Sequence, residues 1–219
     1  MKIRVAGHAG FCMGVKRALE SLLKERGKEK GALYTYGPII HNTQVLELLE
    51  KKGILVLPEE GPTQRGTVVL RAHGAPPEVK ERLRAMGLRV VDGTCPKVRW
   101  VQGLVKKHIK LGDDVVILGE PHHPEVIGLV GHGMGKPHVI QGPDQINSLP
   151  RLRSPVLLAQ TTQEREKFGE TEKALRALYP DLKIHDTICD ATKERQEEVR
   201  QLAQRVDAIV VVGGRHSGN

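Results

Sequence analysis

Apolar residues follow two alternating patterns along the chain. Between positions 14 and 26, Val15, Ala18, Leu19, Leu22 and Leu23 have the spacing that places side chains on one face of a helix. Short apolar runs bounded by Gly, Pro or Asp separate such segments, as is typical of buried strands. The first pattern predicts helices at 14–26, after the cap at 41–43, from 76, over 98–109, and at 124–130, 163–178 and 191–205. The second predicts strands at 54–57, 68–70, 88–91, 115–118, 139–140, 156–159, 182–184 and 208–212.

Strands that alternate with helices predict an α/β fold with small parallel sheets flanked by helices. Ligands of such folds collect at the carboxyl ends of the strands. The most informative strand end is Asp92-Gly93-Thr94-Cys95-Pro96, because two β-branched residues precede it and Pro96 suits the first position of a helix. Cys95 is therefore expected at a helix N-terminus, where its thiolate is favoured.

The surroundings of Cys95 are repeated twice. Cys189 follows a predicted strand and an Asp-x-x-Cys turn, and Cys12 follows a looser apolar run at 3–5. A loop opened by glycine carries a histidine 29, 28 and 27 residues after the three cysteines, at His41, His123 and His216. A third polar position lies 61 residues after Cys12, at His73, and 66 residues after Cys95, at Thr161.

Self-similarity at a fixed spacing indicates copies of one structural unit. We expect three pseudo-symmetric α/β lobes, at 1–94, 95–187 and 188–219, each donating a cysteine and polar loops to a shared centre. The third lobe is expected to be incomplete. By the repeat, its remaining strand and loop would lie near positions 250 to 255, roughly, so the natural gene product is expected to be longer.

The amino-acid composition indicates which kind of ligand the protein binds and argues against a membrane span. The formal net charge is +8, and aromatic residues make up only 3% of the chain. A basic chain without aromatic stacking surfaces favours a small anionic substrate over a nucleic acid. No run approaches the roughly 18 apolar residues of a membrane span, and residues 1–8 lack an apolar signal core, which predicts a cytoplasmic protein. Three cysteines, an odd number, argue against a disulfide framework.

Three cysteines in equivalent settings favour a metal site over three separate buried thiols. One possibility is a Cys3His zinc site, with a loop histidine as the fourth ligand. The other is a 4Fe–4S cluster, which normally takes four thiolates. With three thiolates, one iron stays open to a substrate, and an open position is typical of a catalytic metal site.

The loops that contain His41, His73 and His123 precede predicted helices or a glycine turn. Helix N-termini with adjacent histidines are suited to binding anions, especially phosphate. Glu125 follows His123 at a predicted helix start, and it is either a favourable charge in a first helical turn or a general acid. Thr161 and Thr162 offer hydroxyl groups at an equivalent strand end.

Eight short motifs resemble those of one known family. They are Gly10-Phe11-Cys12-Met13-Gly14-Val15, Gly37-Pro38-Ile39-Ile40-His41-Asn42, Arg71-Ala72-His73-Gly74, Asp92-Gly93-Thr94-Cys95-Pro96, His123-Pro124-Glu125-Val126, Ala159-Gln160-Thr161-Thr162, Cys189-Asp190-Ala191-Thr192 and Gly213-Gly214-Arg215-His216-Ser217-Gly218-Asn219. The family is 4-hydroxy-3-methylbut-2-enyl diphosphate reductase (LytB/IspH), the last enzyme of the non-mevalonate isoprenoid route, and the resemblance covers essentially the whole chain in order.

The resemblance implies three α/β lobes around a central 4Fe–4S cluster with one open iron. It implies reductive removal of an allylic hydroxyl group, which gives isopentenyl and dimethylallyl diphosphate, with ferredoxin or flavodoxin as the electron donor. The roles that it implies are cluster ligation for Cys12, Cys95 and Cys189, diphosphate binding for His41, His73, His123, Ser217 and Asn219, proton donation for Glu125, and contact near the substrate hydroxyl for Thr161.

Two other classes fit part of the pattern. A cluster-dependent dehydratase would also use three cysteines and an open iron, but it would act without net electron transfer. A phosphate-binding module stabilised by zinc would have no activity, and metal analysis would find zinc without iron or sulfide. The product ratio and the oligomeric state are left open by the sequence.

Overall fold

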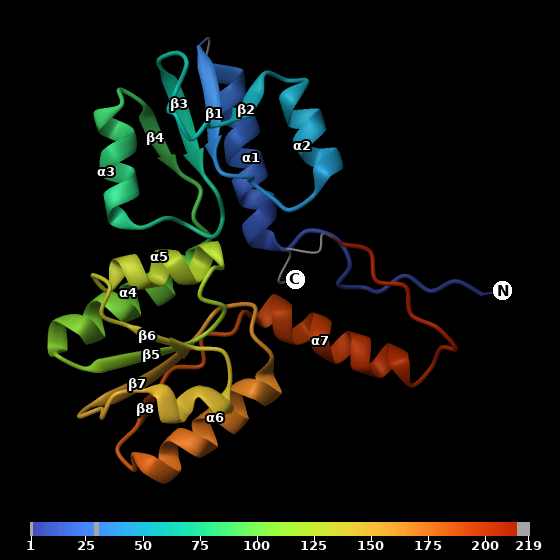
Figure 1. The fold of residues 1–219 in the computed structure, drawn as a ribbon. Helices are drawn as coiled ribbons and strands as arrows, with labels where there is room; N and C mark the ends of the chain where they lie inside the picture. Colours follow the sequence, from blue (N-terminus) through green and yellow to red (C-terminus); the bar gives the residue numbers. More distant parts are fainter. Residues whose placement is uncertain (1, 29–30, 214–219) are drawn as a thin grey trace.

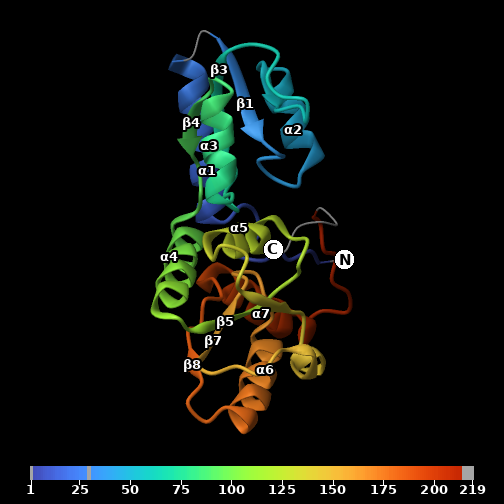
Figure 2. The same ribbon diagram turned by 60° about the vertical axis from the view of Figure 1, so that its left-hand side comes forward.

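The computed structural model describes residues 2–28 and 31–213 of the chain. Its strands form two four-stranded sheets, and every strand pair in both sheets is parallel. Figure 1 shows one sheet with its helices above the other, and Figure 2 shows the same two bodies from the side. The predicted α/β fold with small parallel sheets is therefore confirmed.

The first sheet has the strand order β2-β1-β3-β4. Its strands are β1 (Ala32–Tyr36), β2 (Ile54–Val56), β3 (Gly66–Leu70) and β4 (Arg89–Asp92). Helices α1 (Met13–Lys28) and α2 (Thr43–Glu50) pack on one face of the sheet, against Leu33 and Val69. Helix α3 (Pro77–Ala85) packs on the other face, against Tyr34 and Val68.

The second sheet has the order β6-β5-β7-β8. Its strands are β5 (Asp114–Leu118), β6 (His138–Ile140), β7 (Pro155–Ala159) and β8 (Lys183–Ile184). Helices α4 (Pro96–Leu111) and α5 (Pro124–His132) cover one face, and α6 (Arg165–Leu178) with the 3-10 helix η1 (Pro143–Ser148) covers the other. The last described helix, α7 (Asp190–Ala203), projects sideways from the level at which the two bodies meet (Figure 1).

The two sheets repeat one design. If the strands of each sheet are numbered in chain order, both read second, first, third, fourth, and a helix pair covers the equivalent face of each. In this order the chain reverses direction across the sheet between the first and third strands, and that is where α/β folds bind ligands. The repeat inferred from the cysteine spacings is thus present in the topology of residues 32–184.

Four differences from the sequence-based expectations stand out. The central strand β1, Ala-Leu-Tyr-Thr-Tyr, is not among the predicted strands, because its polar hydroxyl groups interrupt the apolar run that marks its neighbours. The 3-10 helix η1 is likewise not predicted. The predicted strand at 208–212 is wrong for this structure, and so is the looser strand at 3–5, since neither segment has strand geometry.

Both of those segments expose their apolar side chains. Val210, Val211 and Val212 are 85%, 82% and 92% exposed, and Ile3 and Val5 are 76% and 82% exposed. A strand requires a neighbour for its backbone hydrogen bonds, and no strand lies beside either segment in the described part of the chain.

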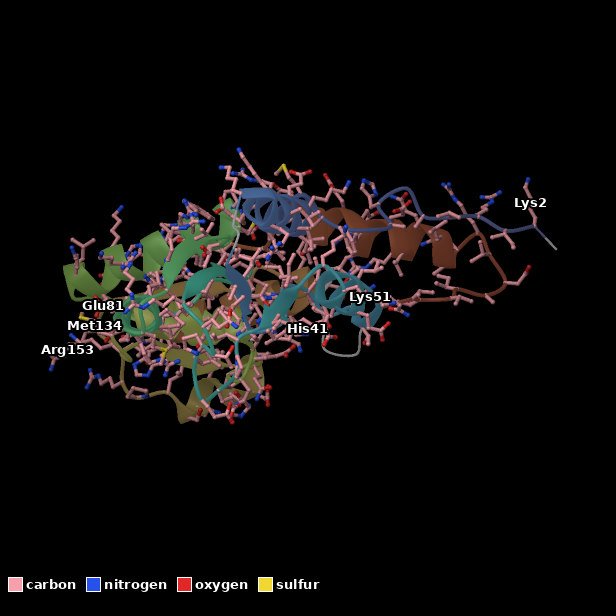
Figure 3. The ribbon with its side chains drawn as sticks, turned by 90° about the horizontal axis from the view of Figure 1, so that it is seen from above. Lys2, His41, Lys51, Glu81, Met134 and Arg153 are labelled. Atoms are coloured by element: carbon pink, nitrogen blue, oxygen red, sulfur yellow. The ribbon has the colours of Figure 1, made fainter. Side chains whose placement is uncertain are left out.

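The N-terminal segment is attached to α7. The Glu198 carboxylate accepts hydrogen bonds from the backbone N–H groups of Gly7 and His8, at 2.5 and 2.9 Å. Arg195 donates to the carbonyl oxygens of His8 and Gly10. Figure 3 shows Lys2 at the far end of this extended segment, well away from His41. Residues 7–10 therefore lie beside the helix that follows Cys189.

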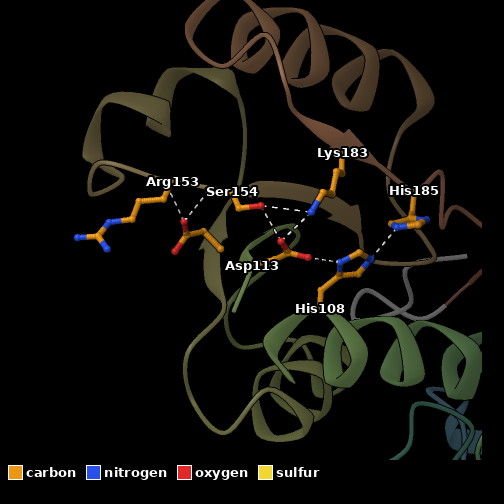
Figure 4. A network of polar contacts seen from close by, with 7 residues as sticks. His108, Asp113, Arg153, Ser154, Lys183 and His185 are labelled. Atoms are coloured by element: carbon orange, nitrogen blue, oxygen red, sulfur yellow. Dashed lines mark hydrogen bonds and ion pairs between the residues drawn. The ribbon is translucent and has the colours of Figure 1, made fainter. Parts of the chain in front are cut away.

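A polar network fastens the second sheet at the amino ends of β5 and β7 (Figure 4). Asp113 accepts three hydrogen bonds, from His108 Nδ1 at 2.7 Å, Ser154 Oγ at 2.6 Å and Lys183 Nζ at 2.7 Å. These bonds hold the pKa of Asp113 well below its usual range. On the other side of the ring, His108 Nε2 and His185 Nε2 share a hydrogen bond of 2.9 Å. The network joins α4 to the edge strand β8.

Replacing the carboxylate at the centre of this network should destabilise the fold. Asp113→Asn should lower the free energy of unfolding by about 2 kcal/mol, because the amide cannot accept all three hydrogen bonds. The depressed pKa stabilises the wild type above the ordinary Asp pKa, and this contribution is lost as the pH falls below it. The variant should therefore lose less stability than the wild type between pH 7 and 3 in urea unfolding. The exposed control Asp181→Asn should behave like the wild type.

Candidate functional site

Each of the three cysteines lies directly before a helix. Cys12, Cys95 and Cys189 precede α1, α4 and α7, and their carbonyl oxygens accept hydrogen bonds from the N–H groups four residues on, at 3.0, 2.9 and 3.0 Å. The expectation that Cys95 caps a helix is confirmed. A helix N-terminus offers unpaired N–H groups and a partial positive charge, which stabilise a thiolate.

The turns before Cys95 and Cys189 have the same construction. The Asp92 carboxylate accepts from the backbone N–H of Thr94, and the Asp186 carboxylate accepts from that of Ile188. The cysteine N–H then crosses to the preceding strand end: Cys95 donates to the Ala72 carbonyl at 2.9 Å. Cys189 donates equivalently to the Thr161 carbonyl at 2.8 Å. Each cysteine is thus tied to the loop at the third polar position of the preceding unit.

Gly14 leaves the space between two of the thiols. A Cβ atom at this position would lie 2.7 Å from Cys95 Sγ and 3.8 Å from Cys12 Sγ, so both sulfur atoms approach the same side of the α1 backbone. Burial raises the pKa of the Cys95 thiol. Charge on Cys189 and Cys12 raises it further, which indicates that the three thiols share one neighbourhood.

In residues 2–28 and 31–213, no three His, Cys, Asp or Glu side chains are arranged to hold a single metal ion. The loop histidines lie in a separate cluster. His73 is at its centre, with ring centroids 5.7 Å from His41 and 5.2 Å from His123.

Two histidines of the cluster, His73 and His123, are kept neutral. The pKa of His73 is lowered to about 3, mainly by burial and also by the charges of His123, Arg71 and His41. Burial also lowers the pKa of His123, while Glu120 opposes this effect. The Nδ1 atom of His73 is buried and has no hydrogen-bond partner in the described part of the chain. Neutral imidazoles with unused N–H capacity suit an anion that brings its own acceptors.

Glu125 is buried at the start of α5. Its carboxyl group is only 1% exposed and has Thr161 as its partner. The Thr161 backbone N–H donates to Oε1 and the Thr161 hydroxyl to Oε2, each at 2.7 Å. Burial raises the pKa of Glu125 to about 7, against the opposing effect of both hydrogen bonds. A carboxyl group with this pKa is suited to hold and release a proton near neutral pH.

Glu125 and the histidine cluster meet at one helix start. His123 caps α5, and its Nδ1 accepts the backbone N–H of Glu125 at 3.2 Å. The structure therefore brings Glu125 together with Thr161, and His123 together with His73 and His41. Ser217, Asn219 and His216 lie outside the described residues.

Arg71 is a residue of this region that the site hypothesis did not include. It lies one position after β3, and it is partly buried beside Gly37, which follows β1. A Cβ atom on Gly37 would lie 2.9 Å from Arg71 Nη1, and Gly37 has a φ of +68°. The motif Arg71-Ala72-His73-Gly74 contains the signal, because an arginine two residues from a phosphate-binding histidine is suited to the same ligand.

Comparison with known proteins places these features in a family. The family model described as LytB protein matches residues 3–219. The chain belongs to the LytB family. It is 43% identical to the 4-hydroxy-3-methylbut-2-enyl diphosphate reductase of Desulfovibrio desulfuricans, over 100% of this chain and 80% of that protein. It is 40% identical to the reductase of Aquifex aeolicus, over 99% of this chain and 76% of that one.

Solved structures of LytB-family members have the same fold. A structure of (E)-4-hydroxy-3-methyl-but-2-enyl diphosphate reductase, described as the terminal enzyme of the non-mevalonate pathway, matches with a TM-score of 0.80 and 40% identity. That match covers 99% of this chain and 78% of the other. The Plasmodium falciparum reductase matches with a TM-score of 0.89 and 27% identity, over 95% and 67% of the two chains. The resemblance inferred from the eight motifs is confirmed.

The hydrogen bond from the Thr161 hydroxyl should lower the pKa of the Glu125 carboxyl. Thr161→Val removes a hydrogen bond that favours the ionised form, so the pKa of Glu125 should rise, by about one unit. The pKa is measured as the pH midpoint of the protonated-carboxyl infrared band that Glu125→Gln abolishes. Thr162→Val is the matched control, because the Thr162 hydroxyl accepts from Gln160 instead. An unchanged midpoint in Thr161→Val would show that the hydroxyl does not act on Glu125.

Proposed function

We propose that this chain is a 4-hydroxy-3-methylbut-2-enyl diphosphate reductase. It would remove the allylic hydroxyl group of its substrate with two electrons and two protons, one proton leaving in the water and the other entering the new C–H bond. The products would be isopentenyl and dimethylallyl diphosphate, as the last step of the non-mevalonate isoprenoid route. The observation that carries the proposal is the buried Glu125, which is held by Thr161 and adjoins a cluster of neutral histidines. Membership of the LytB family supports the same reaction.

Cys12, Cys95 and Cys189 would hold a 4Fe–4S cluster that leaves one iron open. Their fit is supported by three features: equivalent helix N-termini, the space left by Gly14, and the effect of the Cys12 and Cys189 charges on the Cys95 thiol. Three partly buried thiolates repel one another, and a cationic cluster core would offset this repulsion. A cubane offers a separate iron to each thiolate, so its ligands need not converge on one point as those of a single ion do. When bound, the cluster supplies single electrons and Lewis acidity toward the substrate hydroxyl.

Glu125 would deliver the proton that leaves with the hydroxyl group as water. With a pKa of about 7, the carboxyl is about half protonated at neutral pH, becomes fully protonated below it and loses its proton above it. Thr161 would orient the carboxyl through its two hydrogen bonds and bring its own hydroxyl near that of the substrate.

His41, His73 and His123 would bind the diphosphate. Because His73 and His123 are neutral, they act as N–H donors, and desolvation inside the pocket strengthens each bond. Ser217 and Asn219 are proposed for the same group on the basis of the family motif. The lobes at 1–94, 95–187 and 188–219 are proposed to surround the cluster.

The proposed electron donor is ferredoxin or flavodoxin, and the proposed location is the cytoplasm. None of the described helices is long and apolar enough to cross a lipid bilayer.

Removing the transferable proton should stop turnover while the site stays assembled. Glu125→Gln keeps the shape of the side chain, since the amide oxygen can accept from the Thr161 N–H and the amide nitrogen can donate to the Thr161 hydroxyl. With a chemical reductant, its reductase rate should fall at least about 100-fold, with iron content and substrate affinity close to those of the wild type. Glu164→Gln changes a nearby exposed carboxylate and is the control. Wild-type turnover in Glu125→Gln would remove this residue from the mechanism.

The space at Gly14 gives a second test. Gly14→Ala would place a methyl group 2.7 Å from Cys95 Sγ, and after anaerobic reconstitution it should hold roughly half or less of the wild-type iron and sulfide. Gly103→Ala is a matched control inside α4, because a Cβ there meets nothing within 4 Å. If the wild type, Gly14→Ala and Gly103→Ala hold equal amounts of iron and sulfide, the space at Gly14 is not needed for cluster binding.

A further inference from the structure

The neutral histidines of the proposed diphosphate pocket do not balance the negative charge of a diphosphate ligand. A diphosphate group carries several negative charges at neutral pH. Burial and neighbouring positive charge keep His73 and His123 uncharged, so they offer hydrogen bonds but no fixed positive charge. Glu120 lies close enough to His123 to raise its pKa, so one carboxylate also acts on this region. Some other group has to compensate for the charge of the ligand.

We infer that Arg71 supplies the fixed positive charge of the diphosphate pocket and donates to the phosphate oxygens through its guanidinium group. This inference rests on the proposed function and adds a residue to it. Its basis is the position of the side chain, which is set by two independent features of the backbone.

The first feature is the place of Arg71 in the sheet. It directly follows β3, and its guanidinium lies over Gly37, which directly follows β1. β1 and β3 are the neighbouring strands between which the connections of the first sheet diverge. Arg71 therefore occupies the ligand-binding edge of the first sheet.

The second feature is the fit of Gly37 beneath the guanidinium. Any residue other than glycine would place a Cβ atom 2.9 Å from Nη1 and 3.3 Å from Cζ. The φ of +68° at Gly37 is a left-handed conformation that glycine adopts without strain. The loop after β1 is thus shaped to let the arginine lie flat against its backbone.

The hydrogen-bonding capacity of Arg71 is not used up by the protein. Its Nε atom is buried and has no hydrogen-bond partner within residues 2–28 and 31–213, and the same is true of Nδ1 of His73. The charge of Arg71 lowers the pKa of both His73 and His123, so the guanidinium lies near these imidazoles. Two buried nitrogen atoms without partners, on neighbouring side chains, suit a ligand rich in acceptor oxygens.

The test measures binding of inorganic pyrophosphate to the cluster-loaded protein by calorimetry. Arg71→Gln should weaken this binding at least about tenfold, since a charge-assisted hydrogen bond is lost. Arg71→Lys keeps the charge without the planar fork and should recover part of the affinity. Arg65→Gln is the matched control, because Arg65 is exposed and precedes the opposite end of β3. The affinity of the wild type should also fall with added salt more steeply than that of Arg71→Gln.

The possible outcomes separate this inference from the proposed function. If the wild type does not bind pyrophosphate, the diphosphate pocket itself is wrong. If the wild type binds and folded Arg71→Gln binds within about twofold of it, only the assignment of Arg71 is overturned. Arg71→Ser is a second, shorter neutral variant. Loss of folding in both neutral variants would assign Arg71 to structural support of the loop, and would likewise overturn the inference.

Discussion

Parallel strand pairing is the constraint on which the candidate site depends. In a parallel sheet every strand ends at the same edge, and the chain has to leave that edge through a turn into a helix. The described sheets are entirely parallel, so their strand-end loops and helix N-termini collect at one edge of each sheet. Cys95, His73, His123 and Thr161 all belong to such loops. The chemistry is concentrated there because the backbone topology leaves no other place for these turns.

Backbone hydrogen bonds join the cysteine turns to the loops that follow neighbouring strands. The N–H groups of Cys95 and Cys189 bond to carbonyl oxygens at the ends of β3 and β7, so each thiol is held against the loop of the preceding strand. Thr161 is the most connected of these positions: its carbonyl accepts from Cys189, and its N–H and hydroxyl donate to Glu125. A single residue thereby couples a thiol position to the buried carboxyl.

The sequence predicts the alternation of helix and strand, the helix starts at Cys95 and Cys189, and the first two of three expected copies of one α/β unit. It does so because apolar periodicity, proline and Asp-x-x-Cys turns are local signals. It fails at β1, where tyrosine and threonine side chains are buried by tertiary packing that no local pattern contains. It also fails at 3–5 and 208–212, where apolar residues are present but no strand lies alongside them in the described part of the chain.

The candidate site shows the same limit. Cysteine, histidine and glutamate are residue types that often bind metals or transfer protons, so the candidate cysteines and histidines and Glu125 could be identified from the sequence. The raised pKa of Glu125, the neutrality of His73 and the part played by Arg71 depend on burial and on contacts between distant segments. These properties follow from the fold and are not encoded in any single motif.

Three thiols, a buried acid and an anion pocket are proposed to form one reductase site. The most direct test is a single turnover of anaerobically reconstituted protein, reduced with dithionite and mixed with 4-hydroxy-3-methylbut-2-enyl diphosphate, with products identified by mass spectrometry. We expect isopentenyl and dimethylallyl diphosphate, with the cluster oxidised as they form. Protein that carries about four irons per chain and binds the substrate, yet forms neither product, would contradict it.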